Sequence, residues 1–272
     1  MDRRSSPATA RVAHVSLKGI VSAPAFTEGE LIRVTAPLVD LLTGPNGKRD
    51  RQLCLGQSFT VIDQEEDMAF GFAGRDGFCG WLPLSALAKL PQPTHWVATP
   101  GTHLYAEPRV QARDIAALTM GCEVQVVADA GKFQQTSLGY IPSPHLLPLS
   151  QRHHDPVLVA EGFLNTPYLW GGNSRAGIDC SGLAQTALLA CGIACPGDSD
   201  QQEQLGHEIP PDVALARGDL IFWKGHVALI VDDTQLIHAN GHSMSVAYED
   251  TATCIARVTL QGGGPVTHRR RL

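Results

Sequence analysis

The sequence has no long hydrophobic run and no excess of positive charge. No stretch approaches the roughly 18–20 apolar residues that a membrane-spanning helix requires, and the two arginines near the N-terminus precede no apolar segment of the secretory-signal kind. The formal net charge is −6 at pH 7, which argues against nucleic acid or an anionic membrane as the main partner. We therefore expect a cytoplasmic protein that binds neither.

The cysteines form no framework. There are seven, an odd number scattered along the chain, which is typical of a reducing compartment. Cys191 and Cys195 have three residues between them, but no second pair accompanies them, so we expect no zinc site there. The chain also has no HExxH or phosphate-loop motif. We expect neither a metal ion nor an organic cofactor.

The chain divides into four segments by composition and pattern. Its 272 residues are enough for two or three domains. Residues 1–29 show no clean period and are predicted to form a loose lead-in or an arm that packs on the next domain. Residues 30–91 and 92–149 are two copies of a repeat. Residues 155–265 come after a short linker and form the last predicted domain.

The repeat is recognised by a short strand pattern that ends each copy. The first copy has Gly80-Trp81-Leu82-Pro83 and the second has Gly139-Tyr140-Ile141-Pro142, each followed by a leucine four residues beyond the proline. Short alternating segments separated by Gly, Pro, Asn and Asp are typical of small antiparallel barrels. The pattern resembles bacterial SH3-like domains. Copies this small are expected to pack on each other or on the next domain.

The last segment is predicted to be an α+β domain in which helices precede a sheet. Asp155-Pro156 opens a first helix, and Asp179 caps a second that runs from Cys180 to a stop at Gly192. Ser199 fits the cap of a third, short helix. The strands expected after it cover 220–223, 226–231, 236–239 and 244–248, with a possible edge at 258–260.

Cys180 is the best candidate for a nucleophile. It lies at the first helical position, where unpaired backbone N–H groups and the positive end of the helix dipole stabilise a thiolate. A peptide-cleaving thiol also needs a base and a third group that orients the base. His226 opens a buried-looking strand and is the best base, and His238 on the next strand can lie beside it. Each histidine alone is more often a satisfied structural residue.

Five motifs in order resemble those of the NlpC-type cell-wall cysteine peptidases. They are Tyr168-Leu-Trp-Gly-Gly, Asp179-Cys-Ser-Gly, Gly218-Asp-Leu-Ile-Phe-Trp, Gly225-His-Val-Ala and Ile237-His-Ala-Asn. The resemblance covers residues 155–260 and implies a reduced papain-like fold. It implies Cys180 as nucleophile, His226 as general base and acid, and His238 as the orienting third member. Tyr168 matches a tyrosine near the oxyanion, although it can also serve only to pack its loop.

Two SH3-like copies ahead of such a domain resemble the relatives that cut free murein peptides during wall recycling. Those enzymes hydrolyse the bond between γ-D-glutamate and diaminopimelate or lysine, and require an unblocked N-terminal L-alanine. The residues implied for substrate binding are Asp179, Ser181, Asp50, Ser199, Phe78 and Trp170. Phe78 stands where the relatives have a tyrosine, so one hydroxyl is missing. Asp179 and Ser199 can equally be helix caps, and Asp50 a solvated loop residue.

Two other functions remain open from the sequence. The same Cys-His-His set can serve an amidase or acyltransferase acting on another amide. Alternatively, the SH3-like pair binds peptide and the last domain is inert, which the intact set argues against. The preferred diamino acid and the oligomeric state have no signal in the sequence.

Overall fold

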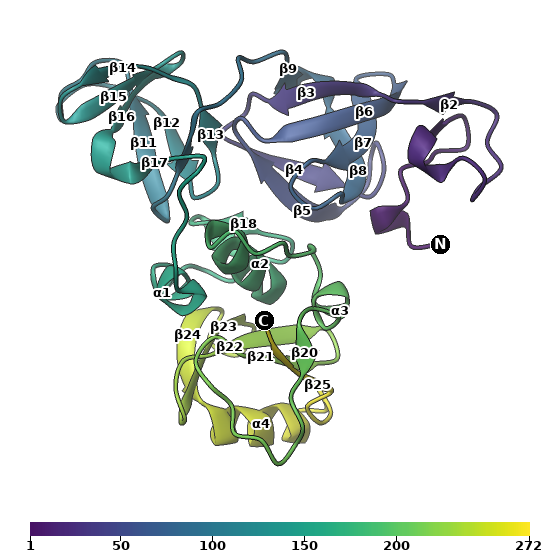
Figure 1. Ribbon diagram of the computed structural model, residues 1–272, viewed down its shortest axis with the longest axis vertical. Helices are drawn as coiled ribbons and strands as arrows, with labels where there is room; N and C mark the ends of the chain where they lie inside the picture. The colour runs from purple at the N-terminus through teal and green to yellow at the C-terminus, as the bar shows by residue number, and fades with distance from the viewer. The chain divides into compact units, whose positions relative to one another are not determined.

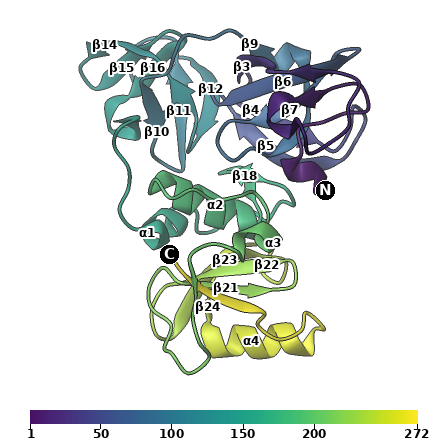
Figure 2. The same cartoon turned by 45° about the vertical axis from the view of Figure 1, so that its right-hand side comes forward.

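The computed structural model describes residues 1–272 and divides into two compact units, residues 1–151 and 152–272 (Figures 1 and 2). The first unit is almost entirely β, and the second combines helices with one main sheet. None of the helices has the length and apolar character needed to span a membrane. The expected class, an α+β domain preceded by small all-β barrels, is confirmed.

Residues 1–29 form an arm on the first barrel, one of the two expected arrangements. The arm contains η1 Arg3–Ser5, β1 Ala13–His14, η2 Val15–Leu17 and β2 Phe26–Thr27. Thr9 Oγ1 donates to Asp63 Oδ2 at 2.6 Å, and Arg11 Nη1 lies 3.0 Å from Glu65 Oε2. The ring of His14 packs edge-on against Phe72. Polar contacts to the barrel wall therefore hold the arm, although its sequence has no regular period.

The two copies of the repeat build the same sheet order. In the first copy the order is β5-β4-β8-β7-β6-β3-β9, and in the second β12-β11-β16-β15-β14 with a smaller sheet β13-β10-β17. The first copy has β3 Glu30–Val34, β4 Leu38–Leu42, β5 Arg49–Cys54, β6 Ser58–Glu65, β7 Met68–Ala73, β8 Cys79–Pro83, η3 Leu84–Ala86 and β9 Leu87–Ala88. The second has β10 His95–Val97, β11 Gly101–Tyr105, β12 Asp114–Thr119, β13 Glu123–Val124, β14 Val126–Ala130, β15 Phe133–Thr136, β16 Gly139–Pro142, η4 Ser143–His145 and β17 Leu146–Pro148. In both copies the Gly-aromatic motif is a strand, and a 3₁₀ turn and a short strand come after it.

The two copies share apolar core, as their small size suggests. One buried cluster joins Cys54 and Leu55 of the first copy to Val97, Leu104 and neighbouring residues of the second. The backbones meet at Gly56, where an added Cβ would lie 1.9 Å from the carbonyl oxygen of Glu123. Arg33 Nη1 also donates to Gly56 O at 2.7 Å. This close approach requires glycine, because any side chain would overlap the facing backbone.

The second unit places helices on both faces of a six-stranded sheet. Its helices are α1 Pro156–Glu161, α2 Cys180–Ala190, α3 Ser199–Gln202 and α4 Thr251–Leu260. The sheet order is β20-β25-β21-β22-β23-β24, and a separate hairpin, β18-β19, precedes α2. The strands are β18 Asn173–Ser174, β19 Gly177–Ile178, β20 His207–Glu208, β21 Leu220–Trp223, β22 His226–Ile230, β23 Gln235–Asn240, β24 Ser245–Asp250 and β25 His268–Arg271. Helices α2 and α4 lie on opposite sides of the sheet (Figures 1 and 2).

Two local predictions for this unit are wrong. Residues 258–260 belong to α4 and are not an edge strand, because Asp250 caps the helix by accepting from Thr253 N at 2.8 Å. Cys254, Ile255 and Val258 then pack onto the sheet as one helical face. Ser199 is the first residue of α3 and not its cap; Asp198 takes the cap position, although its side chain makes no capping hydrogen bond.

The contact at Gly56 leads to a stability prediction with a matched control. Gly56 and Gly77 have nearly the same backbone, with φ of +80° and +74°, but an added Cβ at Gly77 meets nothing within 4 Å. Gly77→Ala therefore costs only the backbone conformation, about 1 kcal/mol. Gly56→Ala also forces the copies apart and is expected to cost roughly 2 kcal/mol more. Urea unfolding measures both variants, and equal losses would contradict the shared core.

Candidate active site

Cys180 begins α2 on a backbone that the surrounding sequence defines at both ends. Asp179 is the N-cap, and the helix ends in a Schellman motif in which Gly192 N donates to Leu189 O and Ile193 N donates to Leu188 O. Cys180 is 6% exposed, and its Sγ lies 4.0 Å from the carbonyl oxygen of Gly225. The thiol therefore sits at a helix N-terminus and beside the turn that leads into β22.

Asp179 uses both carboxylate oxygens on the surrounding backbone. Oδ1 accepts from Gly182 N at 2.6 Å and from Ser181 Oγ at 3.2 Å, and Oδ2 accepts from Gly171 N at 2.8 Å. The residue is 5% exposed. It thus ties the diglycine loop to the start of α2. Of the two roles open in the sequence, helix cap and substrate contact, the geometry supports the cap directly.

His226 and His238 lie side by side across neighbouring strands. His226 opens β22, His238 lies on β23, and Nε2 of the first is 2.9 Å from Nδ1 of the second. The indole of Trp223 packs against the His226 ring, with 5.6 Å between centroids. Since His238 takes Nε2 of His226, Nδ1 is the ring nitrogen that remains to serve the thiol.

Both imidazoles are neutral at neutral pH. Burial, with His238 and Arg257 nearby, lowers the pKa of His226 to about 3. Burial also lowers the pKa of His238 to about 4, against the opposing charge of Glu249. A neutral imidazole can accept a proton, which an imidazolium cannot. His226 is therefore in the form that a general base requires.

The relay extends further than the sequence indicated. His238 Nε2 lies 3.2 Å from Glu249 Oε2, and Arg257 binds both oxygens of that carboxylate at 2.8 and 2.7 Å. Arg257 holds the pKa of Glu249 at about 2. Glu249 faces His238 diagonally, because His238 pairs with Ala247 and Leu236 pairs with Glu249. Knowing that register would have identified Glu249. The role of Arg257 could be predicted only by recognising that the segment that carries it, α4, is a helix.

The same corner holds a possible metal-binding set. His238, Glu249 and Cys254 offer ligand atoms within 4.8 Å of one another. Arg257 Nη2, however, donates to Glu249 Oε2 and lies 3.7 Å from Cys254 Sγ. Burial raises the pKa of the Cys254 thiol to about 12. A guanidinium thus already occupies the place of a cation, and the thiol is protonated, so the set does not fit a metal ion.

The remaining candidates in this unit lie in different environments. Tyr168 forms a bridge with Ile178, and its backbone N–H donates to Met244 O at 2.8 Å. This pairing brings the tyrosine alongside the segment that leads into Cys180. Trp170 is 70% exposed, whereas Ser199 is buried at the start of α3.

Two candidates belong to the first unit and differ from expectation. Asp50 accepts hydrogen bonds from both Nη groups of Arg3, at 2.5 and 2.9 Å, so the arm already neutralises its carboxylate. Phe78 is 4% exposed and packs in the apolar core of the first barrel. The aromatic ring is therefore a core residue, which corrects its assignment as a substrate contact.

Family models match both units. The NlpC/P60 family model matches residues 165–261, and the model of the bacterial dipeptidyl-peptidase SH3 domain matches residues 41–87. The first match contains Cys180 and the whole relay to Arg257.

Curated relatives carry peptidase names. A γ-D-glutamyl-L-lysine dipeptidyl-peptidase of Bacillus cereus is 28% identical over 246 residues, which are 75% of this chain and 71% of that protein. Dipeptidyl-peptidase 6 of Lysinibacillus sphaericus is 33% identical, over 49% of this chain and 56% of the relative. The probable endopeptidase NlpC of Escherichia coli is 35% identical over 34% of this chain and 70% of that protein. The chain thus spans between 56% and 71% of the length of these relatives.

A solved structure shares the fold. The crystal structure of an NlpC/P60 family protein from Bacillus cereus superimposes with a TM-score of 0.75, over 89% of this chain and 99% of that one. The two sequences are 21% identical in the superposition. This likeness extends the shared architecture over both units.

The lowered histidine pKa values lead to a prediction about acid stability. A histidine whose pKa is about 4 when folded and 6.5 when unfolded binds its proton only after unfolding between those values. Stability therefore rises with pH through that window and is lost as the pH falls below 6.5. The titration of His238 alone is expected to lower the free energy of unfolding by about 2 kcal/mol between pH 7 and pH 5.

The measurement is urea unfolding at both pH values. His238→Gln should lose about 2 kcal/mol less than wild type on acidification, whatever its stability at pH 7. His207→Gln, an exposed change on β20, is the control and should keep the wild-type difference. An unchanged pH response in His238→Gln would contradict a buried neutral imidazole.

Proposed function

Because the chain belongs to the NlpC/P60 family, we propose that it is a cysteine endopeptidase that cleaves murein peptides between γ-D-glutamate and the diamino acid. The Bacillus cereus relative, a γ-D-glutamyl-L-lysine dipeptidyl-peptidase, supports this choice of bond. The observation that carries the chemistry is a thiol at a helix N-terminus beside the turn that leads into His226, where a partly buried relay runs from His226 to Arg257. We also propose that the enzyme acts in the cytoplasm, in the recycling of wall peptides. Cysteines scattered without a disulfide framework are typical of a reducing compartment.

The first step is acylation. His226 accepts the thiol proton through Nδ1, and the Cys180 thiolate attacks the γ-glutamyl carbonyl carbon. The C–N bond then breaks, and the proton on His226 passes to the departing amine of the diamino acid. This leaves a γ-glutamyl thioester on Cys180 and the released amino component.

The second step is hydrolysis. His226, neutral again, takes a proton from water, and the resulting hydroxide equivalent attacks the thioester carbonyl. The C–S bond breaks, the proton returns to Cys180, and L-Ala-D-Glu leaves as the acid. His238 keeps the His226 ring in one orientation, and Glu249 with Arg257 does the same for His238, so these three are positioning residues.

The oxyanion needs donors in both steps. Cys180 is the first residue of α2, and the positive end of the helix dipole favours negative charge beside it. The Tyr168 hydroxyl is the proposed donor, supported by the pairing of its strand segment with Ile178. Tyr168 therefore acts on the developing charge and not on the proton transfer.

The requirement for an unblocked alanine is also part of the proposal. Asp179, Ser181, Ser199 and Trp170 remain its candidates around the substrate. The Arg3 guanidinium binds both oxygens of Asp50. Asp50 can therefore bind the ammonium of a substrate only after Arg3 has left it. The alternative of an amidase on another amide has no observation in its favour.

The bond and nucleophile are tested together. Purified protein is incubated with L-Ala-γ-D-Glu-diaminopimelate, and the products are identified by mass spectrometry. L-Ala-D-Glu should appear with wild type and with Cys191→Ala, a cysteine at the other end of α2, and be absent with Cys180→Ala. An N-acetylated peptide should resist cleavage. Cleavage by Cys180→Ala, or of the acetylated peptide at an equal rate, would contradict the respective claim.

Glu249 is tested as a positioning residue. Glu249→Ala leaves Arg257 unpaired beside His238 and should lower kcat by on the order of 10- to 100-fold with little change in KM. Glu249→Gln keeps one acceptor for the imidazole and should recover part of the rate. Glu208→Gln on exposed β20 is the matched control. Parallel changes in KM and kcat, with an unaltered pH profile, would indicate a merely structural carboxylate.

A further inference from the structure

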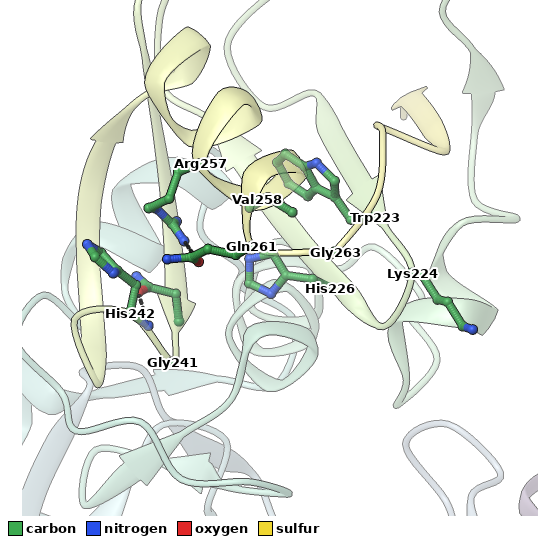
Figure 3. Close-up of a pocket in the computed structure, with 10 residues that line it drawn as sticks. Trp223, Lys224, His226, Gly241, His242, Arg257, Val258, Gln261 and Gly263 are labelled. Atoms are coloured by element: carbon green, nitrogen blue, oxygen red, sulfur yellow. Dashed lines mark hydrogen bonds between the residues drawn. The ribbon is translucent and has the colours of Figure 1, made fainter.

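A cavity of about 440 Å³ borders His226 on the histidine side of the site. Figure 3 shows His226 in its wall, close to Gln261 and Gly263 of the segment that follows α4. None of the residues that line the cavity comes from α2 or α3. During the thioester stage the acyl half of the substrate is bonded to Cys180, the first residue of α2. The groups that hold this half must therefore surround the start of α2, a region to which the cavity does not extend.

A buried glutamine ties α3 to that region. Gln202, the last residue of α3, is 0% exposed. Its Nε2 donates to Ser181 O and to Pro196 O, both at 2.9 Å, and to Gly197 O at 3.5 Å. Because three carbonyl oxygens surround the nitrogen, the amide can have only this orientation. One side chain thus joins the first turn of α2 to the loop before α3 and to α3 itself, and α3 lies next to α2 in both views (Figures 1 and 2).

The amide oxygen of the same side chain is unsatisfied. Gln202 Oε1 is buried and has no hydrogen-bond partner, which makes the residue costly to keep for stability alone. The carbonyls that its nitrogen serves have other donors. Pro196 O accepts from Cys195 Sγ at 3.5 Å, and Ser181 O lies in the first turn of a helix, where the N–H four residues later is its usual partner. An apolar side chain of the same size would serve the fold about as well, which points to a role in the site.

The reacting groups do not depend on this tether. Asp179 fixes the start of α2, and with it Cys180, through two glycine N–H groups at 2.6 and 2.8 Å. The relay histidines lie on β22 and β23. Loss of the tether would therefore leave the thiol and its base in place and release α3. Ser199 lies one turn before Gln202 on α3, so it would move with that helix.

We propose that Gln202 is a positioning residue for the acyl half of the substrate, and that it acts by holding Ser199 at a fixed distance from Ser181. The inference rests on the proposed function, in which both serines are candidates around the substrate. The acyl half, L-Ala-γ-D-Glu, carries ammonium, amide and carboxylate groups, which need partners at fixed spacings. Loss of the tether lowers the affinity for this half without changing the chemical step.

The kinetic test uses L-Ala-γ-D-Glu-diaminopimelate as substrate. Gln202→Met keeps the size of the side chain without its amide, and should raise KM about 10-fold with kcat within about two-fold of wild type. Gln202→Asn keeps the amide but is too short to join both carbonyls, and should act in the same direction. Gln204→Met, the same change at an exposed position two residues later, should leave both constants unchanged. An unaltered KM in both Gln202 variants would overturn the proposal.

A double variant separates positioning from a merely structural role. If Gln202 acts through Ser199, then Ser199→Ala should raise KM in the wild-type background and add little in the Gln202→Met background. Urea unfolding should give similar midpoints for Gln202→Met and wild type. Additive effects of the two changes on KM, or a loss of stability with an unchanged KM, would overturn the proposal.

Direct binding separates this proposal from the proposed function. Cys180→Ala protein, with and without Gln202→Met, is titrated with the dipeptide L-Ala-γ-D-Glu in a calorimeter. Binding that weakens about 10-fold with Gln202→Met supports the positioning role even if wild type cleaves no peptide. Cleavage by wild type, with equal affinities of the two titrated proteins for the dipeptide, would uphold the peptidase and overturn the role of Gln202. A failure of Cys180→Ala protein to bind the dipeptide would also overturn that role.

Discussion

The active site depends on two hydrogen-bonded histidines, of which His238 is fully buried and His226 half-buried. Burial keeps both rings neutral, since a charge there would lose its hydration. Such an arrangement is costly unless every polar atom has a partner, and the partners come from three elements: His226 from β22, His238 from β23 and Glu249 from β24. Arg257 on α4 neutralises the carboxylate at the end of the line. The strands must therefore be in register, and α4 must be docked, before the site is complete.

The sequence was sufficient for the parts of this site that local chemistry defines. Asp179 and Gly192 fix the limits of α2, because a cap and a left-handed stop are readable from single residues. The strand that carries His226 was readable from its apolar run. The role of Glu249 could not be predicted from the sequence, because it depends on a diagonal contact with His238 that the pairing of β23 with β24 produces. The β propensity of residues 258–260 also gave a wrong prediction. This segment is helical because its apolar face is buried against the sheet.

The first unit shows the same limit for charged and aromatic residues. Asp50 looked like a residue available to a substrate amine, but the arm that the sequence left unassigned returns Arg3 to it. Phe78 looked like a substitution in a binding loop, but it is a core side chain of the barrel. In both cases the motif gave the position correctly, whereas the neighbours that decide the role come from segments distant in the chain. A family resemblance identifies which positions correspond. Whether the side chain at such a position is exposed depends on how the rest of the chain packs around it.

Arg257 connects the histidine relay with the cavity beside His226. Two of its nitrogens hold Glu249 and so reach the relay, while Nη1 holds Gln261 at the wall of the cavity beside His226. The guanidinium is planar and rigid, so a shift that improves one set of contacts moves the other. The relay and the wall of the cavity are therefore coupled through one side chain on α4.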